Sequence, residues 1–184
     1  MDHFLFDLDG TLLPMKQEEF VRYYLPLLAA RFQDRGFSPE QLIGAVWKGF
    51  ERMVANDGSR TNEEVFWDSF SKDLSIRREE VETEVLDFYG NDFNQAICTT
   101  RPDPFAAEII RYLKEKGKKV YLATNPVFPR CATMNRIRWA GLDAADFEEI
   151  TTYETCRYSK PSVGYFQEIL RSGLRWFRSR ISWK

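Results

Sequence analysis

The sequence is poor in the residues on which many enzyme sites depend. Among its 184 residues there are one histidine, His3, and three cysteines, Cys98, Cys131 and Cys156. A single histidine excludes histidine-based catalytic triads and multi-histidine metal sites. The cysteines are odd in number and widely spaced, which predicts reduced thiols that pack as small buried apolar side chains. Any chemistry therefore runs on carboxylates, hydroxyls and lysine.

The chain also lacks a charge excess and a long apolar run. Lys plus Arg number 26 against 28 for Asp plus Glu, so no global basic field is available and no nucleic-acid partner is expected. The longest apolar stretch, residues 23–30, contains Pro26 and is too short to span a bilayer. The first residues show no basic-then-apolar signal pattern. We expect a cytoplasmic protein with no membrane span.

Three apolar runs predict strands. The first, residues 3–8, is interrupted by Asp7 and ended by Gly10, and the second covers residues 119–123. A weaker third run covers residues 147–152. Helical periodicity precedes the second run and follows both the second and the third, and this alternation is typical of a parallel sheet with helices on its faces. We therefore predict an α/β fold with a Rossmann-like core.

Helical periodicity replaces this pattern between the first two strands. Four amphipathic segments follow one another over residues 16–93, and Thr61 and Glu64 form a candidate capping box for the third. We predict a four-helix insertion at residues 16–96, with a core built from residues 1–15 and 97–184. Five aromatic residues of the insertion are expected in the bundle interior rather than in a substrate pocket: Trp47, Phe50, Phe66, Trp67 and Phe70.

Polar residues gather at the carboxyl ends of the predicted strands, where open parallel sheets bind their ligands. Asp7 and Asp9 follow the first strand, Thr124 and Asn125 end the second, and Lys160 comes shortly after the third. Residues two apart on an extended chain project to the same side. Paired carboxylates beside a hydroxyl and a lysine suit phosphoryl transfer.

Such a transfer sets requirements that these residues meet. Asp7 attacking phosphorus is an anion approaching an anion, so Mg²⁺, Lys160 and the Thr124 hydroxyl are expected to neutralise the developing charge. Asp9 would protonate the departing alcohol and then activate water. Asn125 has two equally weighted roles, capping the following helix or touching substrate.

The segment Phe6-Asp7-Leu8-Asp9-Gly10-Thr11-Leu12 resembles the first motif of the haloacid dehalogenase superfamily, whose commonest members are Mg²⁺-dependent phosphatases. Ala123-Thr124-Asn125 and Lys160-Pro161 resemble its second and third motifs, and the resemblance extends to about Leu170. It implies a helical cap between the first two motifs.

The resemblance also implies a role for each site residue. Asp7 is then the nucleophile, and Asp9 the general acid and base whose backbone carbonyl also meets the metal. Asp7 and Asp9 are thus the candidate Mg²⁺ ligands. Thr124 binds the transferring phosphoryl group and Lys160 steadies nucleophile and phosphate. The candidate substrate-binding residues are Gly10, Thr11 and Asn125.

The chain departs from the family in its last residues. The acidic fourth motif is absent, because Glu168 is the only acid after Lys160 and residues 171–184 hold five basic residues and no carboxylate. Three accounts remain open: a native basic amphipathic helix, a truncated or frame-shifted end, or an inactive relative that retains binding. The missing strand predicts a sheet incomplete at the C-terminus, with an unpaired edge that invites self-association.

These observations lead to one functional prediction and its alternatives. We predict a Mg²⁺-dependent phosphatase that hydrolyses a small phosphate monoester through an aspartyl phosphate on Asp7, with activity impaired by the missing motif. A phosphomutase or a 2-haloacid dehalogenase would use the same residues. The alternative from another class is a non-catalytic binding or interaction module. Specificity belongs to the cap, so the sequence does not identify the substrate.

Overall fold

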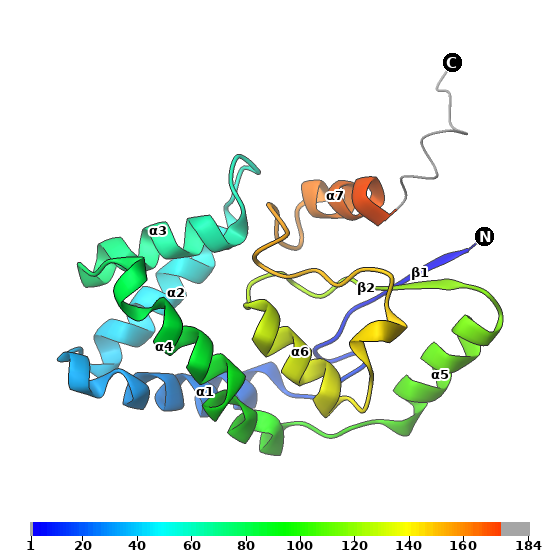
Figure 1. Cartoon of the computed structure of the whole chain (residues 1–184), viewed down its shortest axis with the longest axis horizontal. Coiled ribbons are helices and arrows are strands. Elements are labelled where there is room, and N and C mark those ends of the chain that lie inside the picture. The colour runs from blue at the N-terminus through cyan, green and yellow to red at the C-terminus, as the bar shows by residue number, and fades with distance from the viewer. Residues whose placement is uncertain (1, 174–184) are drawn as a thin grey trace.

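The computed structural model describes residues 2–173, and within them a short parallel sheet lies beside a group of helices (Figure 1). Strand β1 (His3–Phe6) pairs in parallel with β2 (Lys119–Leu122), in a register that sets Phe6 opposite Leu122. The predicted α/β class with a parallel sheet is confirmed, although the sheet is smaller than expected.

The third predicted strand, at residues 147–152, is reduced to one bridge. A short 3-10 helix, η3 (Ala144–Asp146), precedes it, and Ile150 alone forms a parallel bridge with Leu122. The next residues turn away, since the Thr155 backbone N–H already bonds the Thr152 carbonyl. The predicted weaker strand is therefore present only in part, as this bridge and the backbone hydrogen bonds of residues 148–151 to β2, because side-chain periodicity does not report where a backbone turns.

Helices cover both faces of the sheet. Val120 and Leu122 belong to the large core together with α5 (Pro104–Glu115) and α6 (Arg130–Trp139). Ala123, whose side chain points the opposite way, packs in a separate cluster with α7 (Val163–Gly173). Figure 1 shows α7 on the other side of the strands from α5 and α6.

Four α-helices fill most of the interval between the strands, where four were predicted. Their bounds are α1 (Gln17–Arg31), α2 (Pro39–Val54), α3 (Asn62–Leu74) and α4 (Arg78–Gly90), with the 3-10 turns η1 (Gln33–Arg35) and η2 (Asp92–Thr99). The capping box at Thr61 is present, since its hydroxyl accepts from the Glu64 N–H and the Glu64 carboxylate accepts from the Thr61 N–H. The division into a cap at 16–96 and a core stays a prediction.

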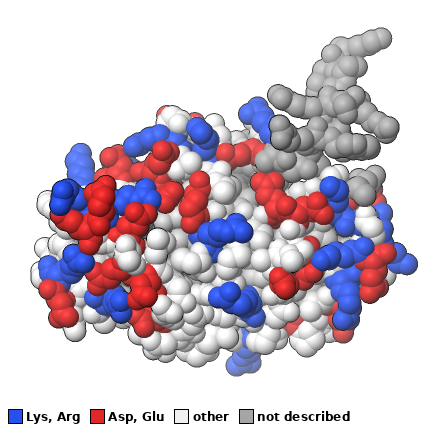
Figure 2. Space-filling model, viewed as in Figure 1, with Lys and Arg blue, Asp and Glu red and all other residues white. Residues whose placement is uncertain are grey.

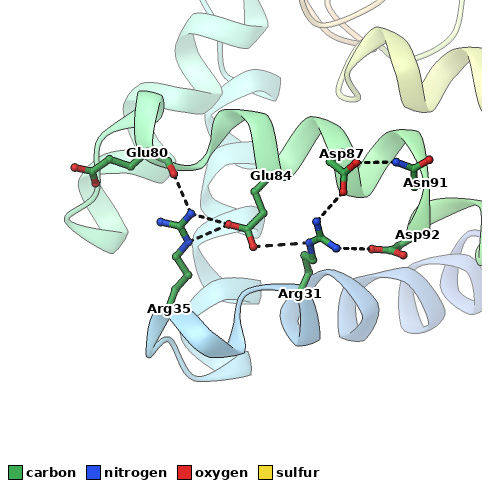
Figure 3. A network of polar contacts seen from close by, with 7 residues as sticks. All are labelled: Arg31, Arg35, Glu80, Glu84, Asp87, Asn91 and Asp92. Carbon is green, nitrogen blue, oxygen red and sulfur yellow. Dashed lines mark hydrogen bonds and ion pairs between the residues drawn. The ribbon is translucent and has the colours of Figure 1, made fainter.

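An ion-pair network holds the first and last of these helices together (Figure 3). The Arg31 guanidinium on α1 lies 2.7 Å from the Asp87 carboxylate on α4 and 3.4 Å from that of Asp92. Arg35 reaches Glu84 at 2.8 Å. These groups are partly exposed, so each pair contributes little to stability and mainly fixes how α1 faces α4.

The stronger link between insertion and sheet is an aromatic cluster around Phe93 of η2. This ring is fully buried and its centroid lies 5.1 to 6.4 Å from those of six others. The six belong to α1, α4, α6 and the segment after β2: Phe20, Tyr24, Phe88, Tyr89, Phe128 and Trp139. One buried side chain therefore joins the helical insertion to the core.

Three further expectations meet different outcomes. Cys98 is exposed, so the expectation of buried thiols was wrong there, whereas Cys156 is buried. Within residues 2–173, β1 has a strand partner on one edge only, and self-association through the other edge stays a prediction. None of the helices in that range is long and apolar enough to cross a membrane. The expectations for residues 174–184 lie outside the described residues.

We expect replacement of Phe93 by alanine to destabilise the protein strongly. Removing a buried phenylalanine leaves a cavity, and such changes cost about 3–5 kcal/mol. The measurement is urea unfolding followed by circular dichroism. Phe105, which is 75% exposed on α5, supplies the matched control, and Phe105→Ala should change the free energy of unfolding by less than about 0.5 kcal/mol. Equal effects of the two variants would contradict the role given to Phe93.

Candidate active site

A cavity of about 380 Å³ lies between the helical insertion and the carboxyl ends of the two strands. The core contributes the predicted residues Asp7, Asp9, Thr124 and Asn125 to its wall. Asp7 directly follows β1, and the Ala123 N–H bonds the Phe6 carbonyl, so the parallel pairing brings the two strand ends level.

Lys160 completes this group through an ion pair with Asp7. Its Nζ lies 2.9 Å from Asp7 Oδ1, and the two side chains are 27% and 39% exposed. The Lys160 backbone N–H donates to Asn125 Oδ1 at 3.1 Å. Asn125 is therefore not a cap for α6, whose N-cap residue is Pro129. It ties the lysine to the end of β2.

Asp9 is held by a residue that the sequence did not single out. Arg136 on α6 is fully buried, and its guanidinium donates to Asp9 Oδ2 and lies 4.2 Å from the centre of the Phe128 ring. Burial raises the pKa of Asp9, and the charge of Arg136 opposes that shift without cancelling it. Asp9 Oδ1 is buried without a hydrogen-bond partner among the described residues. No motif marks Arg136, because an arginine in a helix ordinarily faces solvent.

Thr124 is buried, and its carbonyl anchors the end of β2. That carbonyl accepts from the Thr151 hydroxyl at 2.6 Å and from the Tyr165 hydroxyl at 2.8 Å. Thr151 and Tyr165 were not predicted, and they fix the backbone from which the Thr124 side chain projects. The only sequence signal for them was that Thr151 lies in the predicted third strand and Tyr165 in the helix that follows it.

Two predicted substrate-binding residues do not line the cavity. Gly10 forms the turn after β1 with a φ of 79°, a conformation that glycine adopts without steric cost. Thr11 is exposed and lies in a separate groove beside Phe105. The structure therefore brings five of the seven predicted site residues together and leaves these two outside.

Three aromatic residues expected in the bundle interior line the cavity instead. They are Trp47 and Phe50 of α2 and Phe66 of α3. Trp67 and Phe70 are buried in the bundle, as expected. Helical periodicity groups apolar residues on a face, but it cannot tell a face that meets another helix from one that borders a cavity.

Asn62, the first residue of α3, connects the insertion to two loops of the site. Its side chain is fully buried and donates to the Pro126 carbonyl at 3.0 Å and to the Ser159 hydroxyl at 3.1 Å. Its backbone N–H donates to the Cys156 carbonyl at 2.8 Å. Ser159 precedes Lys160 and Pro126 follows Asn125, so one side chain bridges the second and third motifs.

The donor set is compatible with Mg²⁺ held largely by water and substrate. The described residues contain no cluster of three or more metal-ligating side chains. Asp7 offers a partly exposed carboxylate, and Asp9, whose backbone carbonyl the family resemblance makes a metal ligand, lies in the same wall. One or two carboxylates, completed by water and phosphate, is a common Mg²⁺ arrangement. Asp7 and Asp9 are thus the residues that would hold the ion.

The face drawn in Figure 2 carries charged side chains of both signs. Basic and acidic side chains are interspersed there, mostly over the helical insertion and at the opposite end of the molecule. This face therefore shows no large patch of one charge sign.

A family model for haloacid dehalogenase-like hydrolases matches residues 1–172. The chain belongs to this family of hydrolases. Its fold is similar to that of a HAD family enzyme from Bacteroides thetaiotaomicron, with a TM-score of 0.51, 17% identity, and coverage of 94% of this chain and 78% of that one.

An L-2-haloacid dehalogenase from Xanthobacter autotrophicus, solved with chloropropionic acid covalently bound, aligns at a TM-score of 0.46 and 14% identity. That alignment covers 94% of this chain and 64% of the dehalogenase. No curated protein matches the chain in sequence.

We expect Asn62→Ala to lower both stability and activity. The change leaves the Pro126 carbonyl and the Ser159 hydroxyl without this buried donor, which costs about 1–3 kcal/mol per group left unpaired. Urea unfolding gives the stability, and phosphate release gives the activity. Asn91→Ala is the matched control, because Asn91 bonds only at the exposed surface and should change neither by a measurable amount. Wild-type stability of Asn62→Ala would contradict the bridging role.

Proposed function

We propose that this hydrolase cleaves a phosphate monoester through an aspartyl phosphate formed on Asp7. The observation that carries the proposal is that Asp7 and Thr124 line one cavity and that Lys160 Nζ lies 2.9 Å from the Asp7 carboxylate. An ammonium at this distance can meet the charge that develops on the phosphoryl oxygens.

In the first step Asp7 supplies the new bond to phosphorus. One carboxylate oxygen attacks phosphorus, the bond from phosphorus to the alcohol oxygen breaks, and the alcohol takes a proton from Asp9. In the second step Asp9 takes a proton from water, whose oxygen attacks the phosphorus of the acyl phosphate and releases Asp7 and inorganic phosphate. Bound Mg²⁺ would supply charge neutralisation between carboxylate and phosphate.

The Asp9–Arg136 pair supports the role of Asp9. Arg136 occupies Oδ2 and leaves Oδ1, which has no protein partner among the described residues, as the oxygen that carries the proton. The raised pKa of Asp9, caused by its burial, favours a protonated form for the first step. Arg136 acts here as a positioning residue that fixes the orientation of the carboxyl group.

We expect Asp7→Asn to abolish phosphatase activity. An amide is a poor nucleophile toward phosphorus, and loss of a nucleophile lowers kcat by at least about a thousandfold. Release of p-nitrophenol from p-nitrophenyl phosphate with Mg²⁺ measures the rate. Asp34→Asn, which changes an exposed aspartate of η1, should keep the wild-type rate. Equal rates for Asp7→Asn and the wild type would remove Asp7 from its role.

A chelator separates this proposal from dehalogenation by the same residues. Phosphate release should stop in EDTA and return with added Mg²⁺. Chloride release from 2-chloropropionate that persists in EDTA, with no phosphate release from any ester, would assign the site to dehalogenation. Absence of both activities, with intact folding, would favour the non-catalytic binding module.

We expect Asp9→Asn to slow the enzyme by an amount that depends on the leaving group. General acid catalysis contributes about 10²–10⁴-fold, and an alkyl alcohol needs the proton more than p-nitrophenol does. The ratio of wild-type to variant kcat/KM should therefore be larger for an alkyl phosphate than for p-nitrophenyl phosphate. The same ratio for both esters would contradict a proton transfer from Asp9 to the alcohol.

A further inference from the structure

We propose that the alcohol part of the substrate is uncharged and apolar, and at least as bulky as an aromatic ring or a medium-length alkyl chain. This inference rests on the proposed function and extends it from reaction class to substrate class. It follows from the side chains that the helical insertion contributes to the cavity wall. A second groove, which shares four of the lining residues, supports it.

The helical insertion contributes no charged residue to the wall of the cavity. Its lining side chains are aliphatic or aromatic, apart from Gln17 of α1. The hydroxyls of Tyr24 and Tyr89 are neutral, because burial raises the pKa of both phenols. A substrate with a second charge would therefore find no counter-charge in this part of the site.

The residues that line the cavity are of two chemical kinds. Asp7, which is paired with Lys160, comes from the core and would take the phosphoryl group. Trp47, Phe50 and Phe66 come from α2 and α3 of the helical insertion. A phosphate monoester with an apolar alcohol matches both kinds of residue when its phosphorus lies near Asp7.

A shallow groove outside the cavity continues its wall, and its lining is apolar apart from Gln17, Glu18 and Arg22. It lies along α1 and α2 and has a volume of about 520 Å³. The groove and the cavity share four lining residues: Gln17, Val21, Leu25 and Trp47. Trp47 is 43% exposed and thus borders both spaces. An alkyl chain or fused ring system has room to continue past this indole.

The same wall disfavours polyol phosphates. A sugar hydroxyl buried against the aliphatic and aromatic side chains would lose its water, and the wall offers few polar partners besides the Gln17 amide and the tyrosine hydroxyls, so affinity falls severalfold or more. Each methylene of an alkyl chain gains up to about fourfold in affinity when it is fully buried. Discrimination therefore comes from this wall rather than from the residues that would take the phosphoryl group.

The direct test measures binding of alkylphosphonates, which cannot be hydrolysed, to the wild-type chain by isothermal titration calorimetry with Mg²⁺. We expect the dissociation constant of hexylphosphonate to be at least about thirtyfold lower than that of methylphosphonate. Equal dissociation constants would overturn the proposal, and so would tighter binding of glycerol 3-phosphate than of hexylphosphonate.

Two variants test whether the gain in affinity with chain length comes from contacts with Trp47. Trp47→Ala should reduce the gain from methyl to hexyl by severalfold, because the indole borders both cavity and groove. Tyr23→Ala is the matched control, since Tyr23 on α1 is 40% exposed, close to the exposure of Trp47, and lines neither space. An equal loss in the two variants, or no loss in Trp47→Ala, would overturn the assignment of the apolar wall to the alcohol.

Turnover separates the failure of this inference from that of the proposed function. Hydrolysis of alkyl phosphates with kcat/KM rising along the chain-length series supports both. If alkyl phosphates are hydrolysed with a kcat/KM that does not change with chain length, the phosphatase proposal is supported and the inference about the apolar alcohol is overturned. Chain-length-dependent phosphonate binding without hydrolysis of any ester removes the phosphatase and supports the apolar ligand class.

Discussion

The parallel pairing of β1 with β2 fixes where the chemistry of this protein is located. Two strands separated by more than a hundred residues end at the same edge, since Phe6 lies opposite Leu122. Asp7 and Thr124 therefore meet in one cavity wall, although the sheet is only two strands wide apart from the bridge at Ile150. Because parallel strands end at the same edge of a sheet, polar side chains that are far apart in the sequence lie close together there.

The helical insertion is joined to this edge through buried contacts of two kinds. The rings around Phe93 pack η2 and α4 against α6, and the Trp139 indole also donates a hydrogen bond to Asn94 Oδ1. Asn62 supplies directional bonds to the loops that carry Asn125 and Lys160. Packing sets the distance between the two parts, while the amide sets the orientation of the motif loops. Asn62 therefore couples the start of α3 to the loops that carry Asn125 and Lys160.

The sequence predicted some contacts of this site and missed others, according to what determines each contact. Asp7, Thr124 and Lys160 were predictable because strand order and sheet topology determine their meeting, and both are visible as periodicity. The partnership of Asp9 with Arg136 was not, because it depends on the rotation of α6 about its axis, which a lone arginine in a helix does not reveal. The apolar cavity was missed for the same reason, since Trp47 and Phe66 repeat with the period of a packed helix face.

The pair of Asp9 and Arg136 is hard to explain by stability alone. Burying two charges costs desolvation energy that their attraction often fails to recover, and apolar replacements of similar volume are frequently as stable. Here Arg136 is fully buried, and its guanidinium is accommodated by a hydrogen bond to the Ala132 carbonyl and by the face of the Phe128 ring. Yet Asp9 keeps one oxygen without a partner in the part of the chain that the structure describes. A pair built for stability would satisfy both oxygens. A carboxyl group held at a cavity wall with one oxygen unpartnered is consistent with the proton transfer proposed for Asp9.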